Sequence, residues 1–591
     1  MTILRITGLL LLLCVSMTNA QTMPGGRALL KPDAATTMQL VGDSAEQSAT
    51  SRVVDVAGQP FNKALQVEIL TPVPKPWSVL LIAPLLEPVR KGDVLLLSLY
   101  ARTAKSMTGE SLVSVHLERN GGDWAKLLEA PVATRGDWTR IDLPGVAAFD
   151  LSNDDAQVAI HLGFGQQTVE IAGLSLTNLG PNADVNALPR TRYTYAGREP
   201  DAPWRANADA RIEQHRKSDL TIRTLDADGK PVAGAKVRAR LMRHAFAFGT
   251  AVNVDEILGS EPQNAQYRQT LCELFNTAVF ENETKWPTLD KPDETQRVMR
   301  ALDWLDGRGF RTRGHVLVWP NFEWNPDWLR PLAAEPEKLR DAVRNHVTRT
   351  AGLFRGRFYE WDVLNEPYTN QEFTQILGNP ERAQWFKLAR AADPNALLDI
   401  NDFAILEGNA LDREHIDYYE ATIRELIDQG APLDGIGFQG HFGYLLTNPD
   451  VVLATLDRFG RFGKPMKITE LDINIDDPQL QADYLRDFIT VCFSHPQVTG
   501  VTQWGFWARR HWRPRAALFD EAFKPRPAAI AFKDLVHRKW TTDVTLTTDA
   551  EGVVKVRGFK GDYEITRLDV PSTQREIVVL GDRGADVTLR P

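Results

Sequence analysis

The sequence predicts a multidomain protein in which a (β/α)8 TIM barrel follows a jelly-roll-like β-sandwich, with a small β-module flanking the barrel. Three observations support this prediction. The chain has 591 residues, which is too long for one hydrophobic core. Short apolar runs broken by Gly, Asp and Asn turns fill residues 26–180, as in a β-sandwich. Strand-like and helical stretches alternate through residues 241–540, as in a barrel of parallel strands.

Residues 1–20 have the pattern of a cleavable export signal. Arg5 supplies a positive charge, an apolar stretch runs from Leu9 to Val15, and small residues lead to a cleavage point after Ala20. The apolar stretch is too short to span a bilayer, and no later segment approaches that length. We therefore expect a secreted or periplasmic protein without a membrane span.

The formal net charge of -9 excludes classes of partner rather than identifying one. Nucleic acids and anionic membranes repel an acidic protein, whereas a neutral polysaccharide does not. Cys272 and Cys492 remain after removal of the signal, and we expect two free thiols, with a disulfide between them as the alternative. No Cys/His cluster has the spacing of metal ligands, so no metal site is predicted. We expect a monomer.

Three further segments surround the predicted barrel. Residues 181–217 contain four prolines among Asn and Arg residues and are interpreted as a linker. Residues 218–240 alternate in polarity around an Asp-Gly turn, which predicts a β-hairpin. Residues 541–591 again alternate with a period of two. We expect this C-terminal stretch and the hairpin to combine into one small β-module.

The barrel prediction names its strands. Each is a short apolar run followed by polar or aromatic residues and then by a helical stretch. A doubly wound open sheet is the alternative, but it would not place charged and aromatic residues after so many strands. The eight strands are predicted near residues 245–252, 276–281, 311–318, 357–364, 396–401, 434–439, 466–471 and 499–506.

Two glutamates lie where a predicted strand gives way to a polar loop. Glu366 closes the run that begins at Phe358, and Glu470 closes the run that begins at Lys467. Groups at the carboxyl ends of barrel strands point into the mouth of the barrel. Two carboxyls that face each other there are what glycoside hydrolysis requires, one to protonate the leaving oxygen and one to attack or stabilise the sugar carbon. Taken alone, each residue has a plainer interpretation as a surface carboxylate at the barrel rim.

Six motifs, spread over most of the predicted strands, occur in order along the chain. They are 281–286 (ENETKW), 314–319 (GHVLVW), 361–367 (WDVLNEP), 435–441 (GIGFQGH), 468–472 (ITELD) and 504–512 (WGFWARRHW). With these motifs, the chain from about 241 to 536 resembles glycoside hydrolase family 10, the retaining endo-β-1,4-xylanases. The resemblance implies a TIM barrel, double displacement through a covalent glycosyl-enzyme, and no cofactor.

The resemblance also implies that Glu366 is the acid/base and Glu470 the nucleophile. Both roles agree with the physics of a retaining mechanism, in which the nucleophile stays ionised while the acid holds its proton. His441 is a candidate hydrogen-bond donor to Glu470. Asp472 is a candidate supporting residue, because it lies two positions after Glu470 on the same side of the strand and is placed to orient that histidine.

Further residues are assigned to sugar binding by the same resemblance. Asn365 is expected to bind the 2-hydroxyl of the sugar being cleaved, through a bond that tightens in the transition state. Gln439 is expected either to reach ring hydroxyls or to position Glu470. Several of these assignments have a purely structural alternative. Asn365 would be a turn-forming asparagine, Glu281 a member of a salt bridge, His315 a hydrogen-bonded core residue, and Trp504 or Trp512 an indole buried against the last helix. The remaining candidates are Glu281, Asn282 and Lys285 on the non-reducing side, His315 and Trp319 in the floor of the site, and Trp504 and Trp512 as platform and lid.

The chain departs from the family pattern at three places. Residues 320–324 (PNFEW) replace the usual His-Ser-Gln after Trp319. Phe403 stands where a tyrosine is usual, which removes a hydroxyl. Arg509 and Arg510 add positive charge after the last strand, and they either meet acidic decorations of the substrate or face solvent. We therefore expect reshaped sugar-binding subsites around an unchanged pair of carboxyls.

The predicted sandwich resembles the carbohydrate-binding modules that often precede such catalytic domains, in fold pattern more than in residues. Its candidate stacking faces are Trp77, Tyr100, Trp124 and Trp138. The whole sequence thus predicts an exported xylanase that cleaves internal β-1,4-xylosidic bonds of xylan or a related β-glycan. Two alternatives stay open. One is a β-1,4-glycosidase acting on cellobiosides or decorated oligosaccharides, and the other is a non-catalytic polysaccharide-binding protein on a decayed barrel.

Overall fold

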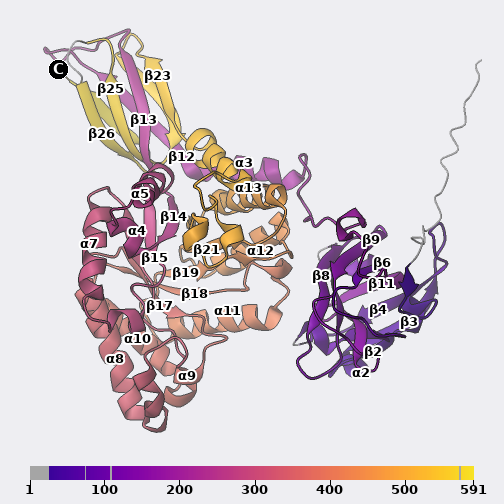
Figure 1. Ribbon diagram of the computed structural model, residues 1–591. Coiled ribbons are helices and arrows are strands. Elements are labelled where there is room, and N and C mark those ends of the chain that lie inside the picture. The colour runs from indigo at the N-terminus through magenta and orange to yellow at the C-terminus, as the bar shows by residue number, and fades with distance from the viewer. Residues whose placement is uncertain (1–25, 74, 107–108, 571–573, 591) are drawn as a thin grey trace, which may run out of the picture. The chain divides into compact units, whose positions relative to one another are not determined.

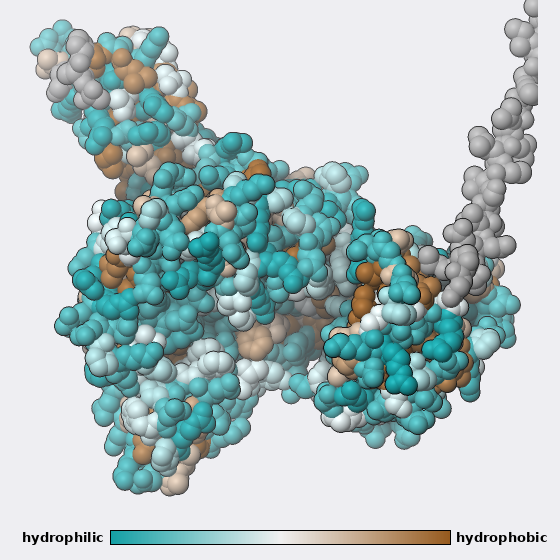
Figure 2. All heavy atoms as spheres, viewed as in Figure 1, coloured by the Kyte–Doolittle hydropathy of each residue, from teal (hydrophilic) through white to brown (hydrophobic). Residues whose placement is uncertain are grey.

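The computed structural model describes residues 26–73, 75–106, 109–570 and 574–590 (Figure 1). The predicted export signal lies outside them. The chain forms two compact units, the first up to Arg192 and the second from Tyr193 onward, and each is described by itself. The visible surface of both units is mostly hydrophilic (Figure 2), so apolar residues are largely turned inward. Among the described residues, no helix has the length and apolarity that crossing a membrane requires.

Two antiparallel β-sheets make up the first unit. Leu97 of β6 (Val94–Ser106) and Val115 of β7 (Ser111–Arg119) belong to rows of alternate residues that have no exposed surface. These rows form the apolar face that each sheet of a sandwich must cover. One sheet has the order β3 (Ala49–Asp55), β4 (Lys63–Ile69), β11 (Gln167–Asn178), β6 and β9 (Thr139–Val146), with β1 (Arg27–Ala28) on β11; the other has the order β2 (Gln39–Val41), β5 (Leu80–Pro84), β10 (Ala156–His161), β7 and β8 (Lys126–Thr134).

A closed barrel of eight parallel strands forms the centre of the second unit, and it confirms the predicted fold class. The first strand pairs with both the second and the last, so the sheet has no free edge. Most of these strands are buried on both faces, as expected when helices cover a parallel sheet. The strands are β14 (Ala247–Val252), β15 (Thr277–Phe280), β16 (Arg311–Gly314), β17 (Glu360–Asn365), β18 (Leu397–Asp402), β19 (Gly435–Phe438), β21 (Met466–Ile473) and β22 (Val498–Gln503), and the short β20 (His441–Phe442) pairs with β21.

The helices around the barrel are amphipathic. In α7 (Glu294–Asp306), the buried residues Val298, Ala301, Leu302 and Leu305 recur at the helical spacing and face the strands. Six of these helices begin with a proline, a position where a missing N–H leaves no bond unmade. Besides α7, the helices around the barrel are α4 (Val254–Leu258), α5 (Pro262–Leu274), α6 (Trp286–Leu289), α8 (Pro336–Leu353), α9 (Glu372–Leu377), α10 (Pro380–Ala392), α11 (Arg413–Asp428), α12 (Pro449–Gly460), α13 (Pro478–Ser494) and α14 (Pro527–Asp534). Cys272 in α5 and Cys492 in α13 are free thiols.

The segment interpreted as a linker contains a helix instead. Helix α3 (Pro203–Arg216) buries Trp204, Ala208 and Ile212 at intervals of four residues, and it packs on α13. Pro203 stands at the start of this helix, the one helical position that favours proline. Proline content alone therefore gave the wrong prediction for this part of residues 181–217.

The predicted hairpin at residues 218–240 is also wrong, although its turn is present. Leu225 and Pro231 form a single bridge around the turn, but β12 (Lys217–Thr224) and β13 (Lys236–His244) then enter different sheets. Their partners come from the C-terminus, because a hairpin alone buries too little to be stable. Figure 1 shows β13 beside the C-terminal strands of this β-module. One sheet has the order β24 (Val553–Phe559), β12 and β27 (Ala585–Leu589). The other has the order β23 (Asp543–Thr547), β13, β25 (Gly561–Arg567) and β26 (Gln574–Leu580).

Candidate active site

Glu366 and Glu470 lie at the carboxyl ends of two barrel strands. Glu366 directly follows β17, and Glu470 lies in the second half of β21. The φ angle of Glu366 is 52°, a left-handed conformation that residues with side chains rarely adopt. Its backbone N–H donates to the carbonyl of Asn401 at 2.8 Å. The surrounding structure therefore holds Glu366 in a conformation that its own backbone preference would not select.

The carboxyl of Glu366 is surrounded by neutral hydrogen-bond donors. Burial raises its pKa to about 7, although hydrogen bonds from Gln439 and Trp319 oppose the rise, and the negative charge of Glu470 adds to it. Glu366 therefore keeps its proton up to near-neutral pH. The donors to Oε1 are Gln439 Nε2 at 2.9 Å and Asn365 Nδ2 at 3.2 Å, and the donors to Oε2 are Trp319 Nε1 and Asn370 Nδ2, each at 3.1 Å.

Glu470 has a different environment. Its carboxyl, 4% exposed, lies 3.3 Å from Nε2 of His441 and accepts a hydrogen bond of 2.9 Å from Asn401 Nδ2. Burial by itself would raise the pKa of Glu470, but the bond from His441 and nearby positive charge, including that of Arg313, lower it below its usual value. Glu470 is therefore ionised in the pH range where Glu366 is still protonated.

His441 lies between two carboxylates. Its Nδ1 is 2.9 Å from Asp472, and its Nε2 faces Glu470. Although burial opposes the charged form, these two carboxylates raise the pKa of His441 to about 10, so the ring is an imidazolium that donates at both nitrogens. Asp472 also accepts from the indole of Trp512 at 2.8 Å and from Arg513 at 3.1 Å. The half-exposed Trp512 packs edge-on against the His441 ring.

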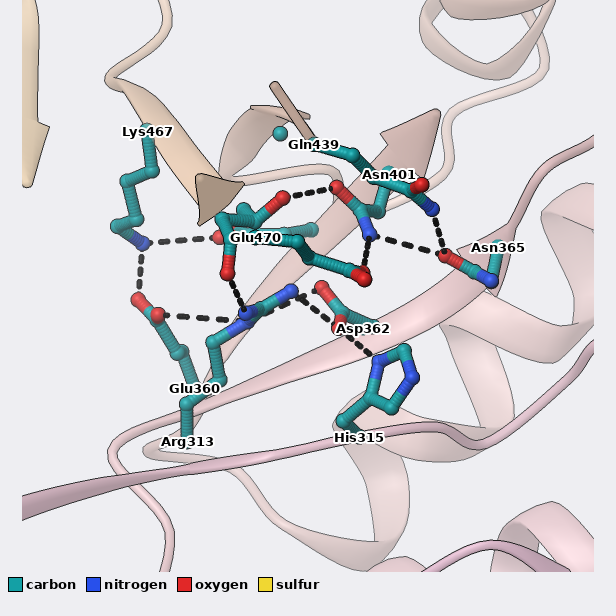
Figure 3. Close-up of polar contacts among 12 residues, drawn as sticks. Arg313, His315, Glu360, Asp362, Asn365, Asn401, Gln439, Lys467 and Glu470 are labelled. Carbon is teal, nitrogen blue, oxygen red and sulfur yellow. Dashed lines mark hydrogen bonds and ion pairs between the residues drawn. The ribbon is translucent and has the colours of Figure 1, made fainter. Parts of the chain in front are cut away.

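Two amide side chains connect the carboxyls. Asn401 Nδ2 donates to both Glu470 and Asn365 at 2.9 Å (Figure 3). Asn365 in turn donates to Glu366 at 3.2 Å. Thr469 donates to the other atom of the Asn401 amide at 2.6 Å, which fixes its orientation. Asn401 was not a candidate from the sequence. The sequence signal that could have identified Asn401 is that it is a polar residue at the end of a buried strand.

A buried network of charged residues lies beside Glu470 in the barrel interior (Figure 3). Arg313 is 1% exposed, donates to Asp362 at 3.2 Å and to the carbonyl of Thr469 at 3.2 Å, and so brings a positive charge close to Glu470. Buried charges persist only when they are paired, as these are. Of its members only His315 was a candidate from the sequence, although charged residues inside predicted strands were a signal for the others. Its other members are His315 with Asp362 at 2.7 Å, and Lys467 with Glu360 and Asp399.

The three residues predicted on the non-reducing side lie at the loop after β15. Lys285 donates to Asn282 at 3.0 Å, and its ammonium lies 5.4 Å from the centre of the Trp319 ring. Burial lowers the pKa of Lys285, although the negative charges of Glu470, Glu281 and Glu366 oppose this. Burial likewise raises the pKa of Glu281. Lys285 is thus a cation set among three carboxyls.

Two further predicted residues differ in their surroundings from what the sequence suggested. The side chain of Gln439 bonds to Glu366, and only its backbone carbonyl accepts from the N–H of Glu470. Trp504 is 6% exposed and packs 5.3 Å from His315, so it lies in the wall rather than on the surface. Among the described residues, no group of three His, Cys, Asp or Glu side chains is arranged to hold a metal ion.

The three departures from the family pattern also have defined surroundings. Trp324 stacks on Trp319, with ring centres 5.2 Å apart and planes 18° apart, while half of its surface stays exposed. The Phe403 ring meets His415 edge-on at 5.1 Å. Arg510 pairs with Glu256 at 2.7 Å. A guanidinium held in this way is less available to an acidic substrate group than the sequence alone suggested.

The chain is similar to a known family, to several named proteins and to solved structures. A model described as Glycosyl hydrolase family 10 matches residues 238–535. The anti-sigma-I factor RsgI6 of Acetivibrio thermocellus is 35% identical over 64% of this chain and 48% of its own length, and endo-1,4-beta-xylanase 1 of Arabidopsis thaliana is 29% identical over 61% and 37%. The chain thus spans less than half the length of these two relatives. Xylanase 10B from Thermotoga petrophila, solved with xylobiose, is 27% identical over 50% of this chain and 95% of its own, with a TM-score of 0.46.

Proposed function

Because the chain belongs to glycosyl hydrolase family 10, we propose that it is an endo-1,4-β-xylanase that hydrolyses internal bonds of xylan with retention of configuration. The observation that carries this proposal is the opposite protonation of two neighbouring carboxyls, with the pKa of Glu366 raised to about 7 and that of Glu470 lowered. Several relatives bear the name endo-1,4-beta-xylanase, which supports xylan as the substrate.

The first half of the reaction uses both carboxyls at once. Glu470 attacks the anomeric carbon, the bond to the glycosidic oxygen breaks, and that oxygen takes the proton of Glu366. The products are a glycosyl ester on Glu470 and a free hydroxyl at the end of the departing chain. Asn365, which already contacts Glu366, is placed to bind the 2-hydroxyl of the sugar as charge develops on its ring.

The second half requires Glu366 to become a base. The negative charge of Glu470 helps to raise the pKa of Glu366, and that charge disappears when Glu470 forms the ester. The pKa of Glu366 then falls, so Glu366 can accept a proton from water while the water oxygen attacks the anomeric carbon. The C–O bond of the ester breaks, and Glu470 is released as a carboxylate next to the His441 imidazolium.

The test is hydrolysis of xylan followed by analysis of products and their stereochemistry. We expect xylo-oligosaccharides of mixed length, and proton NMR should detect the β-anomer before the α-anomer appears by mutarotation. An initial α-anomer would contradict retention. Release of single end sugars only would contradict internal cleavage.

Two other functions are supported by specific observations. The changed loop at residues 320–324 favours a β-1,4-glycosidase with another substrate, and assays on xylan, glucan and an aryl cellobioside in parallel would distinguish it. The relative named as an anti-sigma-I factor bears no enzyme name, which favours the alternative of a polysaccharide-binding protein without catalytic activity. Binding of xylan with no released product would support that reading.

We also propose that the chain is exported and that its first unit binds glycan. Residues 1–20 support export through their signal-like pattern. Trp77 and Trp124 support binding, because more than half of each side chain is exposed, whereas Trp138 and Tyr100 are partly buried against Phe61. Loss of xylan pull-down after Trp77→Ala and Trp124→Ala is the expected result, and unchanged pull-down would contradict it.

A further inference from the structure

Asn370 lies four residues after Glu366, in the loop between β17 and α9. Its side-chain N–H group donates to Oε2 of Glu366 at 3.1 Å. The same nitrogen is 3.2 Å from the backbone carbonyl of Glu366 and 2.9 Å from the hydroxyl of Thr369. Asn370 is therefore a fourth neutral donor to the Glu366 carboxyl, and it was not a candidate from the sequence.

The orientation of the Asn370 amide is set by Asn321. The side-chain N–H group of Asn321 donates to Oδ1 of Asn370. A flipped Asn370 amide would place its oxygen against the Glu366 carboxyl and its NH2 against the NH2 of Asn321, two repulsive contacts. Asn321 itself is 4% exposed and accepts from the backbone N–H of Trp324 at 2.8 Å. One amide thus dictates the direction of the next.

The loop that carries Asn321 is the one that departs from the family pattern. Its other contacts also reach the region just after Glu366: Phe322 N donates to the carboxyl of Glu372 at 2.8 Å, and the carbonyl of Pro320 accepts from Phe373 N at 3.1 Å. The unusual residues 320–324 are therefore bound to the segment that follows the proton donor, and not only to the sugar-binding cleft.

We propose that Asn370 is a positioning residue for the proton donor Glu366, and that Asn321 holds Asn370 in its donating orientation. The proposal rests on the acid/base role proposed above for Glu366. A donor at Oε2 fixes the rotation of the carboxyl and stabilises its ionised form, which the second half of the reaction needs. Asn321 thereby couples the changed loop to proton transfer.

The geometry also indicates which oxygen carries the proton. Each oxygen of Glu366 accepts two hydrogen bonds, so protonation has to displace one donor. Gln439 and Asn365 at Oε1 are 2% and 1% exposed and are held in place, whereas Asn370 is partly exposed and has the Thr369 hydroxyl as another acceptor. Asn370 can release Oε2 with the least loss, which places the proton on Oε2.

The decisive test compares Asn370→Ala with Asn370→Asp in the pH profile of kcat/KM on a xylo-oligosaccharide. Loss of a donor to the ionised carboxyl raises the pKa of Glu366, so the alkaline limb should move up by roughly half a unit to one unit in Asn370→Ala. Asn370→Asp keeps the shape but adds a negative charge, so its limb should move further. A purely structural role predicts an unchanged limb in Asn370→Ala, and that result would overturn the proposal.

The role of Asn321 has its own test. Asn321→Asp keeps the acceptor for Trp324 N and removes the donor to Asn370, so its limb should move in the same direction as that of Asn370→Ala. Because Asn321 acts through Asn370, the alkaline limb of the double variant Asn321→Asp/Asn370→Ala should move no further than that of Asn370→Ala alone. Additive shifts would contradict the coupling. Thr369→Val removes the alternative acceptor, which makes release of Oε2 by Asn370 harder, so its limb should move in the opposite direction, to lower pH.

A titration without substrate separates this proposal from the proposed function. Carbon-13 NMR of the Glu366 carboxyl, compared between wild type and Asn370→Ala, reports the pKa directly. A higher pKa in Asn370→Ala with no xylanase activity in the wild type would refute the proposed function and uphold the contact. An unchanged pKa in an active enzyme would refute the role of Asn370 and leave the proposed function standing.

Discussion

The surroundings of Glu366 and Glu470 differ in charge, although both residues lie at the same end of one barrel, Glu470 buried and Glu366 partly buried. Glu366 is contacted by neutral amide and indole N–H groups, and its pKa is raised to about 7. Glu470 is contacted by an imidazolium and lies near a guanidinium, and its pKa is lowered. Burial raises the pKa in both cases, so the difference comes from the partners. Neutral donors do not overcome burial here, whereas cations do.

Those cations are themselves held by carboxylates. Asp472 holds His441, and Asp362 holds Arg313 inside the barrel. Each cation is therefore fixed in position before substrate arrives, and little reorganisation is needed when charge on Glu470 appears or disappears. On the Glu366 side, where the charge must change in each half of the reaction, the partners are dipoles that tolerate both protonation states.

The largest expected effect is loss of the nucleophile. Glu470→Gln replaces a carboxylate with an amide of the same shape that cannot attack the sugar carbon. We expect kcat to fall by about 10^5-fold or more on both xylan and a dinitrophenyl xylobioside, because the leaving group does not substitute for a nucleophile. Steady-state assays on the two substrates measure this. Substantial turnover of either would show that Glu470 is not the attacking group.

Glu366→Gln should discriminate between the same two substrates. Xylan needs a proton on its leaving oxygen, so its hydrolysis should fall by roughly 10^2- to 10^4-fold. Dinitrophenolate leaves without protonation, so formation of the glycosyl-enzyme should be much less affected and should appear as a burst of released phenol. Equal losses of this first step on both substrates would remove the distinction between the two carboxyls.

His441→Gln should shift the acidic limb of the pH profile. The histidine contributes both a hydrogen bond and a charge that favour ionised Glu470. Without them the pKa of Glu470 rises, and kcat/KM, which requires the carboxylate, should begin to fall at a pH about one unit higher or more than in wild type. At pH values well below the pKa of Glu470 in both proteins, a shift of one unit amounts to about a tenfold loss. The alkaline limb, set by Glu366, is the internal control, and movement of that limb alone would contradict the assignment.

The sequence contained enough information for the barrel and for this pair of carboxyls. Eight apolar runs at regular intervals predicted the strands, and each matched a strand of the structure. The wrong prediction of a hairpin at residues 218–240 has its cause in pairing between strands that are far apart in the sequence. Leu220 of β12 pairs with Val556 of β24, and β13 pairs with strands of the C-terminus, so local alternation suggested a hairpin that does not form. The roles of Glu366 and Glu470, and export, stay predictions.

Residues that act through others were the hardest to predict. Asn401 and Arg313 lie in strands whose neighbours in space come from other strands. Nothing in their local sequence indicates that Asn401 bonds to Glu470 or that the charge of Arg313 acts on it. Asn370 lies in a loop where an asparagine is ordinary. Each becomes informative only when a second side chain is placed beside it.

The smallest expected effect is on stability, and it has opposite signs for the two carboxyls. The pKa of Glu366 in the folded protein lies above its unfolded value, so the unfolded chain releases this proton first and stability falls as pH rises from about 4.5 to about 7. Glu366→Gln removes that fall, and at pH 8 it should be more stable than wild type by on the order of 2 kcal/mol.

Glu470 should behave in the reverse way in the same thermal unfolding experiment. Its folded pKa is lowered, so its contribution to stability is present above the unfolded pKa and is lost only as pH falls through the folded value. Glu470→Gln should therefore unfold at a lower temperature than wild type at pH 8, by a few degrees, and the difference should narrow in acid. Two variants that shift the unfolding temperature in the same direction at pH 8 would mean that cationic and neutral partners do not separate these carboxyls.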